Sequence, residues 1–265
     1  MAWNEFSKQQ DFPMYAELRP KAAWRYLTLE RFAWLLENKK LWLARGDLLG
    51  DPHEGTLTRA QVEAFLKADR EKPASKFANE TQRQADLFLL VVKIRASFYA
   101  NCWIMLEHES NAMWHLYCGS HEGVAIKTTM GQLRDSIPNQ YPVVRVQYTE
   151  DIPPTLDPFL LAGRKRLVFD YEREARILFF GDLPSDSPIV EHPTSVPDHH
   201  EIEWAAAEHV NEIRIHPNAD GQFFNKVIGL LGPLAPSLAA KTRRSEIAES
   251  PFAGFSALWQ KSEEQ

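Results

Sequence analysis

Charged residues interrupt an apolar run at residues 170–178, which read DYEREARIL, and three of them, Glu172, Arg173 and Glu174, are consecutive. If this segment is a β-strand, its side chains alternate between two faces, and one face carries Asp170, Glu172, Glu174 and Arg176. Carboxylates at that spacing raise each other's pKa unless a cation or a ligand compensates. Arg176 or the basic run at 164–166 could supply the cation. The segment predicts either carboxylates that hold a ligand or a solvated face with weak ion pairs.

A carboxylate fixed on a strand suits one kind of chemistry in particular. When a glycosidic bond breaks, positive charge develops on the sugar, and a fixed carboxylate stabilises that charge. Arg25 is a second candidate, because a guanidinium can grip a phosphate through two parallel hydrogen bonds. Its neighbours Trp24 and Tyr26 could form the wall of such a pocket. The alternative for Arg25 is an ion pair with a carboxylate such as Glu54 or Glu174.

Two further segments concentrate polar and aromatic side chains. In the glycine-bounded turn RGDLLGDPHEG (45–55), Asp51, His53 and Glu54 could bind a ligand or a water, or Asp51 could cap the next helix. In NAMWHLYCGSHEG (111–123), Trp114 and Tyr117 share one helix face, which fits a core anchor or a cofactor clamp. His121 follows on a turn and is an acid–base candidate.

Known metal and nucleotide motifs are absent from the sequence. There is no HExxH, GxGxxG, GxxxxGK[ST] or GxSxG pattern. The run DHHE (198–201) lies in a segment rich in proline, where fixed coordination geometry is not expected. We therefore expect no metal, no Rossmann or P-loop site and no serine hydrolase.

Composition limits the class of protein. The 265 residues are 44% hydrophobic, and the net charge of −6 provides no global attraction for nucleic acid or an anionic membrane. The two cysteines, Cys102 and Cys118, form no CxxC pair and indicate reduced thiols. The chain begins without a signal-peptide pattern, and no apolar stretch approaches the ~18 residues needed to cross a bilayer. We expect a cytoplasmic protein without membrane contact.

Periodicity predicts a single α+β domain with a central, mostly antiparallel twisted sheet and surrounding helices. A helical insertion is expected at about 57–97, an N-terminal extension at 1–20 and an exposed loop rich in proline at 182–200. Thr28 and Ser110 are expected to cap helices. The predicted strands are 23–27, 41–44, 98–106, 123–129, 143–149, 169–180 and 210–217, and the other predicted helices are 57–70, 76–97, 110–117, 155–168 and 221–231.

Several blocks of the sequence resemble the bacterial family catalogued as domain of unknown function 2971. The resemblance spans roughly residues 23–240 and rests on WRYL, LWLARGDLLGDPHEG, CWIMLEHESNAMWHLYCGSHEGVAIK, KRLVFDYEREARI and VNEIRIHPNA, in that order. Where such sequences often read Asn-Asp-Pro-Phe-Glu, this chain has Gly-Asp-Pro-His-Glu at 50–54, so no role of that Asn or Phe carries over. The family name supplies no activity.

A second resemblance, carried by single residues, is to the ADP-ribosyltransferase superfamily. In that superfamily an Arg or His holds the NAD phosphate or ribose, an aromatic ring packs on nicotinamide, and a late Glu stabilises the reacting ribose. The matching positions here are Arg25 with Tyr26, then Tyr117, then Glu174 with Glu172. The resemblance implies a transferase or glycohydrolase with NAD as substrate, of the type found in toxins and phage defence.

The sequence thus predicts an enzyme that uses NAD, with Arg25, Tyr117, Glu172 and Glu174 as catalytic residues. Contacts to the nucleotide are expected from Arg25, Tyr26, Trp114, Asp51 and Glu54, and the acceptor would be a protein or nucleic-acid target. The alternative is a binding module without catalysis, which reads a nucleotide, another small molecule or a peptide in the same pocket. A metal-dependent nuclease is the third alternative.

Overall fold

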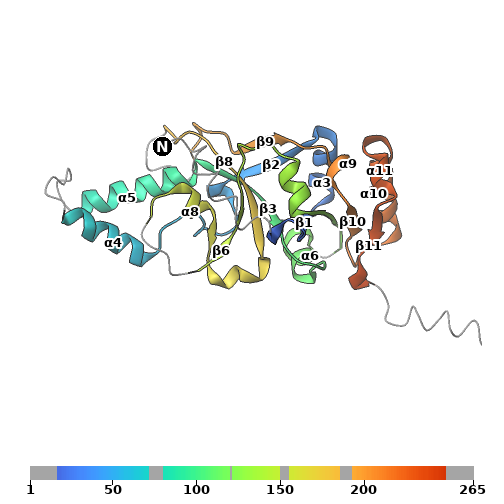
Figure 1. Ribbon diagram of the computed structural model, residues 1–265, viewed down its shortest axis with the longest axis horizontal. Coiled ribbons are helices and arrows are strands. Elements are labelled where there is room, and N and C mark those ends of the chain that lie inside the picture. Colours follow the sequence, from blue (N-terminus) through green and yellow to red (C-terminus); the bar gives the residue numbers. More distant parts are fainter. Residues whose placement is uncertain (1–16, 72–79, 120, 150–154, 186–192, 249–265) are drawn as a thin grey trace, which may run out of the picture. The chain divides into compact units, whose positions relative to one another are not determined.

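The computed structural model describes residues 17–71, 80–119, 121–149, 155–185 and 193–248. The chain divides into two compact units, each assembled from three separated stretches. Both combine helices with mostly antiparallel strands, so the α+β prediction is confirmed (Figure 1). Unit 1 comprises Met1–Arg19, Lys40–Met105 and Arg134–Trp204, and unit 2 comprises Pro20–Lys39, Leu106–Leu133 and Ala205–Gln265.

Unit 1 contains an antiparallel sheet with the strand order β9-β2-β3-β8-β5. Its strands are β2 (Lys40–Arg45), β3 (Phe98–Ile104), β5 (Val143–Arg145), β8 (Glu174–Phe180) and β9 (His199–Glu203). A short parallel pair joins β6 (Gln147–Tyr148) to β7 (Arg164–Lys165). The helices are η1 (Gly46–Leu48), α4 (Arg59–Arg70), α5 (Glu80–Arg95), α8 (Pro158–Ala162) and η2 (Leu167–Glu172).

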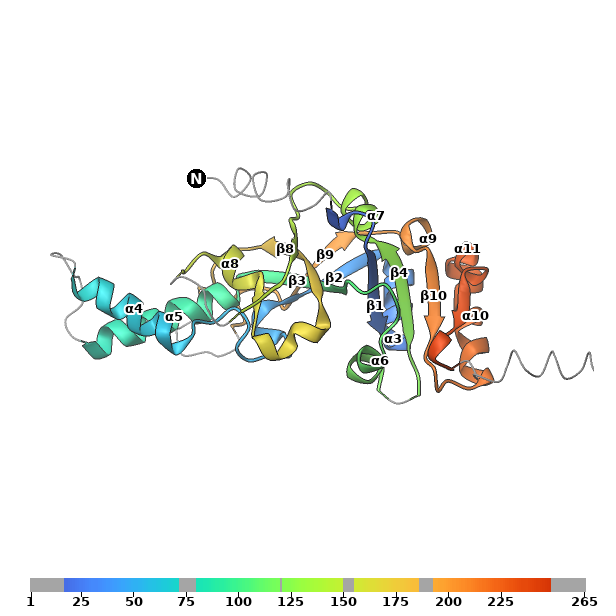
Figure 2. The ribbon, with the colours of Figure 1, turned by 60° about the horizontal axis from the view of Figure 1, so that its bottom comes forward.

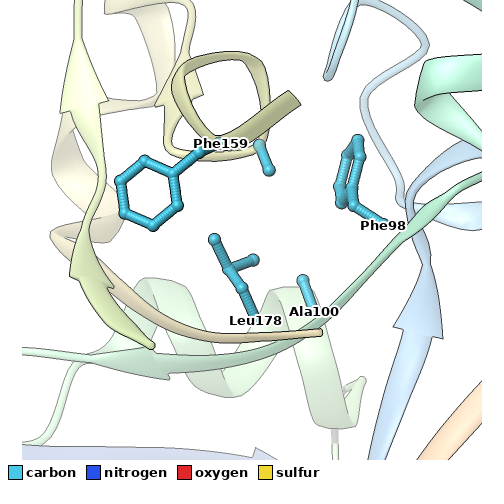
Figure 3. Close-up of a cluster of buried hydrophobic side chains, with 5 residues drawn as sticks. Phe98, Ala100, Phe159 and Leu178 are labelled. Atoms are coloured by element: carbon cyan, nitrogen blue, oxygen red, sulfur yellow. The ribbon is translucent and has the colours of Figure 1, made fainter. Parts of the chain in front are cut away.

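One face of the β3–β8 pair carries a hydrophobic cluster (Figure 3). The register places Ala100 opposite Leu178, and directly opposed residues of antiparallel strands point to the same face. Phe98 lies on the same face of β3, and Phe159 and Ala162 of α8 pack against it. The cluster therefore fixes α8 on the face of β8 that also bears Glu174 and Arg176.

Unit 2 is built on strands in the order β1-β4-β10-β11. These strands are β1 (Ala22–Leu27), β4 (Val124–Thr129), β10 (Glu212–Ile215) and β11 (Thr242–Arg244), of which β10 and β11 pair in parallel. The helices are α3 (Leu29–Asn38), α6 (Asn111–Cys118), α7 (Met130–Asp135), α9 (Ala206–His209), α10 (Gly221–Leu234), α11 (Pro236–Ala239) and η3 (Glu246–Ala248).

Side-chain caps start the main helices of unit 2, as predicted for two of them. Thr28 accepts a hydrogen bond from the backbone N–H of Arg31, and Ser110 accepts one from Met113. These bonds satisfy backbone donors that have no partner inside the helix. Asp220 caps α10 in the same way.

Replacing Asp220 by Ala is expected to lower the free energy of unfolding by about 0.5–2 kcal/mol. The Asp220 carboxylate accepts from Phe223 N–H at 2.8 Å, and its negative charge at the helix start also favours the helix dipole. Urea unfolding measures the change. Asn225→Ala, at an exposed position of the same helix, is the control and should change stability by less than about 0.5 kcal/mol. Equal effects of the two substitutions would contradict the capping role.

Two predicted elements outside residues 169–180 are wrong over part of their length. The helix predicted for 155–168 is limited to α8, which ends before Gly163, and Arg164 and Lys165 then pair with β6 as a strand. The strand predicted for 143–149 is interrupted at Val146, whose N–H donates to the carbonyl of Glu174. Local alternation could not reveal this break, because the partner lies far along the chain.

Other predicted segments fall partly outside the described residues. Of the N-terminal extension, residues 1–16 lie outside, and of the predicted loop at 182–200, residues 186–192 lie outside. That loop ends earlier than predicted, because His199 and His200 already belong to β9. The predicted helical insertion is present as α4 and α5. In the part of the chain that the structure describes, no helix is long and apolar enough to span a membrane.

Candidate functional site

Residues 170–178 do not form one continuous strand. Residues up to Glu172 form η2, Arg173 adopts a left-handed conformation with φ 47°, and β8 begins at Glu174. The Arg173 N–H closes the turn on the carbonyl of Asp170, and the Arg173 carbonyl accepts from Met105 N–H at 2.9 Å. The prediction of an extended backbone from residue 169, and through 171–175, is therefore wrong before Glu174.

This turn brings the carboxyl groups of Glu172 and Glu174 together. Both carboxyl groups contact the same ammonium group, since Lys165 Nζ lies 2.6 Å from Glu172 and 3.0 Å from Glu174. Glu172 is 4% exposed and Glu174 is 2% exposed. The alternative of a solvated face with weak ion pairs is therefore excluded for these two residues.

Two of the basic residues indicated by the sequence compensate the carboxylates. The Lys165 ammonium contacts three carboxyl groups, at 3.0 Å from Glu54, 2.6 Å from Glu172 and 3.0 Å from Glu174. The Arg176 guanidinium lies 3.0 Å from Glu54 and 2.7 Å from Glu174. We call these five buried residues the carboxyl cluster.

The surroundings of Arg176 explain its rigid placement. Its Nη1 donates to the carbonyl of Ala162 at 2.8 Å, and its Nε donates to Glu174 at 2.8 Å. Arg176 lies on the same face of β8 as Leu178 of the hydrophobic cluster, so the guanidinium is held between α8 and the sheet. A charged group this deeply buried is stable only where its partners satisfy it.

The environment separates the pKa values of the two adjacent carboxyl groups. Burial, together with the neighbouring Glu174 carboxylate, raises the pKa of Glu172 to about 8. Burial also opposes ionisation of Glu174, but Arg176 and Lys165 outweigh it and hold the pKa of Glu174 well below its usual range. Three carboxyl groups face two cations in the carboxyl cluster, so one proton on Glu172 balances the charge.

The turn at 50–55 contributes to the same region. Asp51 accepts from His53 N–H within the turn and binds Arg166 through both carboxylate oxygens, at 2.8 and 3.1 Å. The next helix, α4, begins only at Arg59, so the alternative that Asp51 caps it is wrong. Gly55 has φ +69°, and a Cβ there would lie 2.7 Å from the Phe98 ring. Glycine is therefore required at position 55 to bring Glu54 to the cluster.

Tyr148 holds the backbone at the start of β8. Its hydroxyl oxygen accepts the Glu174 N–H at 2.7 Å, and burial, with the nearby Glu174 and Glu172 carboxylates, raises the pKa of Tyr148. The sequence did not indicate this role, because Tyr148 lies 26 residues away on β6.

Tyr148→Phe is expected to lower the free energy of unfolding by about 1–3 kcal/mol, because it leaves the Glu174 N–H without its partner. The ring and its packing are kept, so the loss reports the hydrogen bond. Chemical unfolding of the variant measures it. Tyr171→Phe removes a hydroxyl from an exposed side chain and is the control. A Tyr148→Phe variant as stable as that control would refute the role of the bond.

The remaining candidates lie in unit 2. Arg25 is half-buried on β1, Tyr117 is half-buried on α6, and His121 is exposed. Tyr26 and Trp114 are buried and pack edge to face, with ring centroids 4.9 Å apart.

Hydrogen bonds fix both buried rings. Tyr26 accepts from Ser110 N–H at 2.8 Å, and Trp114 donates to Glu109 at 2.9 Å. Trp114 is thus a core anchor, which was one of the two roles that its spacing from Tyr117 suggested.

The structure therefore assembles part of the predicted set. Glu54, Glu172 and Glu174 meet in unit 1, and Asp51 lies on the same turn as Glu54. Arg25 belongs to the other unit, so its joint action with Glu174 stays a prediction. Sequence reasoning missed that Lys165 joins all three carboxyl groups; the basic run at 164–166 was the available signal.

Comparisons of the chain with family models, with curated proteins and with solved structures find no match. The relationships suggested by the sequence blocks stay predictions. In the described ranges, no group of three or more His, Cys, Asp or Glu side chains is placed to hold a metal ion.

Proposed function

We propose that the chain is an enzyme that acts on the bond between nicotinamide and ribose in NAD, as an ADP-ribosyltransferase or a glycohydrolase. The observation that carries the proposal is the buried pair Glu172 and Glu174, whose pKa values the environment drives apart. Two adjacent carboxyl groups with separated pKa values are the usual arrangement for dividing proton transfer and charge stabilisation between two side chains.

The proposed roles follow from these pKa values. Glu174 stays ionised and stabilises the positive charge that develops on the ribose as the C–N bond breaks and its electron pair leaves with nicotinamide. The acceptor is water or a hydroxyl of a target molecule, and its oxygen forms the new bond to the ribose. Ionised Glu172 takes the acceptor's proton, a task for which a pKa near the working pH is suited.

Burial of both carboxyl groups sets a condition on this proposal. NAD reaches them only after a local rearrangement that opens the carboxyl cluster and keeps Glu172 beside Glu174. The outer side of η2 carries the exposed residues Leu167, Val168 and Tyr171, which could pack on a bound nucleotide.

The test is incubation of the pure protein with NAD, with released nicotinamide measured by chromatography. We expect Glu174→Gln to reduce release by at least about 100-fold, and Glu172→Gln by about 100- to 10,000-fold. The rate of the unchanged protein should rise with pH and level off above about 8, because Glu172 must be ionised to act as a base. Glu172→Gln should remove that dependence on pH.

Glu203→Gln is the matched control, since its side chain on β9 is 81% exposed. It should release nicotinamide at the unchanged rate. Retained release by a folded Glu174→Gln variant would refute the proposed role of Glu174. Absence of release by the unchanged protein, with water or with supplied protein and nucleic-acid acceptors, would refute the enzyme proposal.

A binding module without catalysis is the second candidate, and the complete burial of the carboxyl cluster favours it. In that case the ion pairs position the turn at 50–55 and η2 as a rigid scaffold, and no carboxyl group contacts the ligand. Calorimetric titration would then show binding of NAD or a peptide with no product formed. The Glu203→Gln and Glu172→Gln variants would bind this ligand equally well.

A further inference from the structure

An apolar groove runs beside α5 in unit 1. Its volume is about 870 Å³, within the range of sites for small molecules. Figures 1 and 2 both show α4 and α5 side by side. The apolar wall includes Leu57, Val62, Leu87, Phe88, Val91 and Val92.

The sequence of α5 is more apolar than an exposed helix requires. Residues 87–92 are six consecutive apolar residues, so this part of the helix is apolar around its whole circumference. Helices of that kind are normally covered on all sides. Here Phe88 is 63% exposed and borders the groove. An apolar occupant of the groove would cover this ring.

Arg95 lies at one end of the groove and gives it a charge. Its Nη2 donates to the Asp51 carbonyl over a long distance of 3.4 Å, and its buried Nε has no hydrogen-bond partner among the described residues. No described carboxylate forms an ion pair with Arg95. Asp47 also borders the groove, but its carboxylate is held by Arg45 at 2.6 Å.

We propose that this groove binds an amphiphilic carboxylate, with its alkyl chain along α5 and its head group on the Arg95 guanidinium. A half-buried guanidinium without a counter-ion favours an anionic partner and can bind a carboxylate through two hydrogen bonds. From Gln84 to Arg95 the helix rises about 16 Å, roughly the length of an extended twelve-carbon chain. The ligand class is thus a soluble fatty acid of medium length.

The experiment is calorimetric titration of the full chain with sodium dodecanoate below its micelle-forming concentration. Dodecyltrimethylammonium, which has the same alkyl chain and a positive head, is titrated in parallel. We expect one dodecanoate per chain, bound at least about tenfold more tightly than the cation. Arg95→Gln should remove this preference, and Phe88→Ser should weaken the binding of both probes.

Arg59→Gln is the control, because Arg59 is an exposed arginine on α4 that pairs with Glu63; it should leave the preference unchanged. Arg95→Lys keeps the charge and should retain most of the preference if Arg95→Gln fails to fold. Absence of dodecanoate binding, or an unchanged preference in folded Arg95→Gln, would overturn the proposal. Binding of an acidic amphipathic peptide instead of dodecanoate would also overturn it and identify a protein partner.

Discussion

Replacement of Arg176 by Met is expected to lower the free energy of unfolding by about 3–5 kcal/mol. The guanidinium is 1% exposed and neutralises Glu54 and Glu174, which are themselves buried. Methionine fills similar space but leaves these carboxylates with Lys165 as the remaining cation of the carboxyl cluster. Uncompensated charge in an interior is far more costly than the loss of a surface ion pair. Thermal and urea unfolding, followed by circular dichroism, measure the effect.

Arg59→Met is the matched control for this prediction. Arg59 forms an ion pair with Glu63 at 2.9 Å, but its side chain is fully open to solvent, so we expect a loss below about 0.5 kcal/mol. Adding Glu174→Gln to Arg176→Met should recover part of the lost stability, because it removes one of the stranded charges. A loss below about 1 kcal/mol for Arg176→Met would show that water reaches the carboxyl cluster.

The second large effect is a change in how stability depends on pH. Folding raises the pKa of Glu172 from 4.5 to about 8. Between these two pH values, Glu172 therefore keeps its proton in the folded protein and releases it in the unfolded chain. The contribution of Glu172 to stability is therefore fully present at low pH and is lost as the pH rises through this window. Across this window the free energy of unfolding falls by a few kcal/mol in total, and Glu172 causes no further loss above about pH 8.

Glu172→Gln tests this window directly. Glutamine can still donate a hydrogen bond to Glu174 and does not titrate, so the variant should gain stability relative to the unchanged protein between pH 5 and 8. Burial lowers the pKa of His200 and His216, which gives a slope of the opposite sign in both proteins. The quantity to measure is therefore the difference between the two proteins at each pH. A difference that stays constant from pH 5 to 8 would show that Glu172 is ionised throughout.

Local signals in the sequence predicted much of the secondary structure. The aromatic run at 23–27 and the apolar run at 41–44 became β1 and β2 with small changes at their ends. The caps at Thr28 and Ser110 also formed as predicted, because a hydroxyl side chain acts on backbone groups only three residues away. Such signals act within a few residues, so one sequence suffices to recognise them. Short elements such as β11 contain too few residues to show a period.

The carboxyl cluster could be predicted only in part. The basic residues near Glu172 and Glu174 were visible as candidate partners, but a buried charged segment and a solvated one have the same local pattern. Glu54 lies 120 residues before Glu174 in the sequence. No local pattern in either segment indicates that the two residues meet in the folded protein. The left-handed backbone at Arg173 was equally hidden, since this conformation normally favours glycine.

Because side chains alternate along β8, one face of this strand carries residues of both the carboxyl cluster and the hydrophobic cluster. Glu174, Arg176 and Leu178 occupy successive positions on a single face, so the carboxyl cluster and the hydrophobic cluster share one register against β3. Losing or gaining one residue between Arg173 and Phe180 would reverse the orientation of every later side chain in the strand. An insertion within β8 would therefore displace the charged site and the apolar packing in the same event.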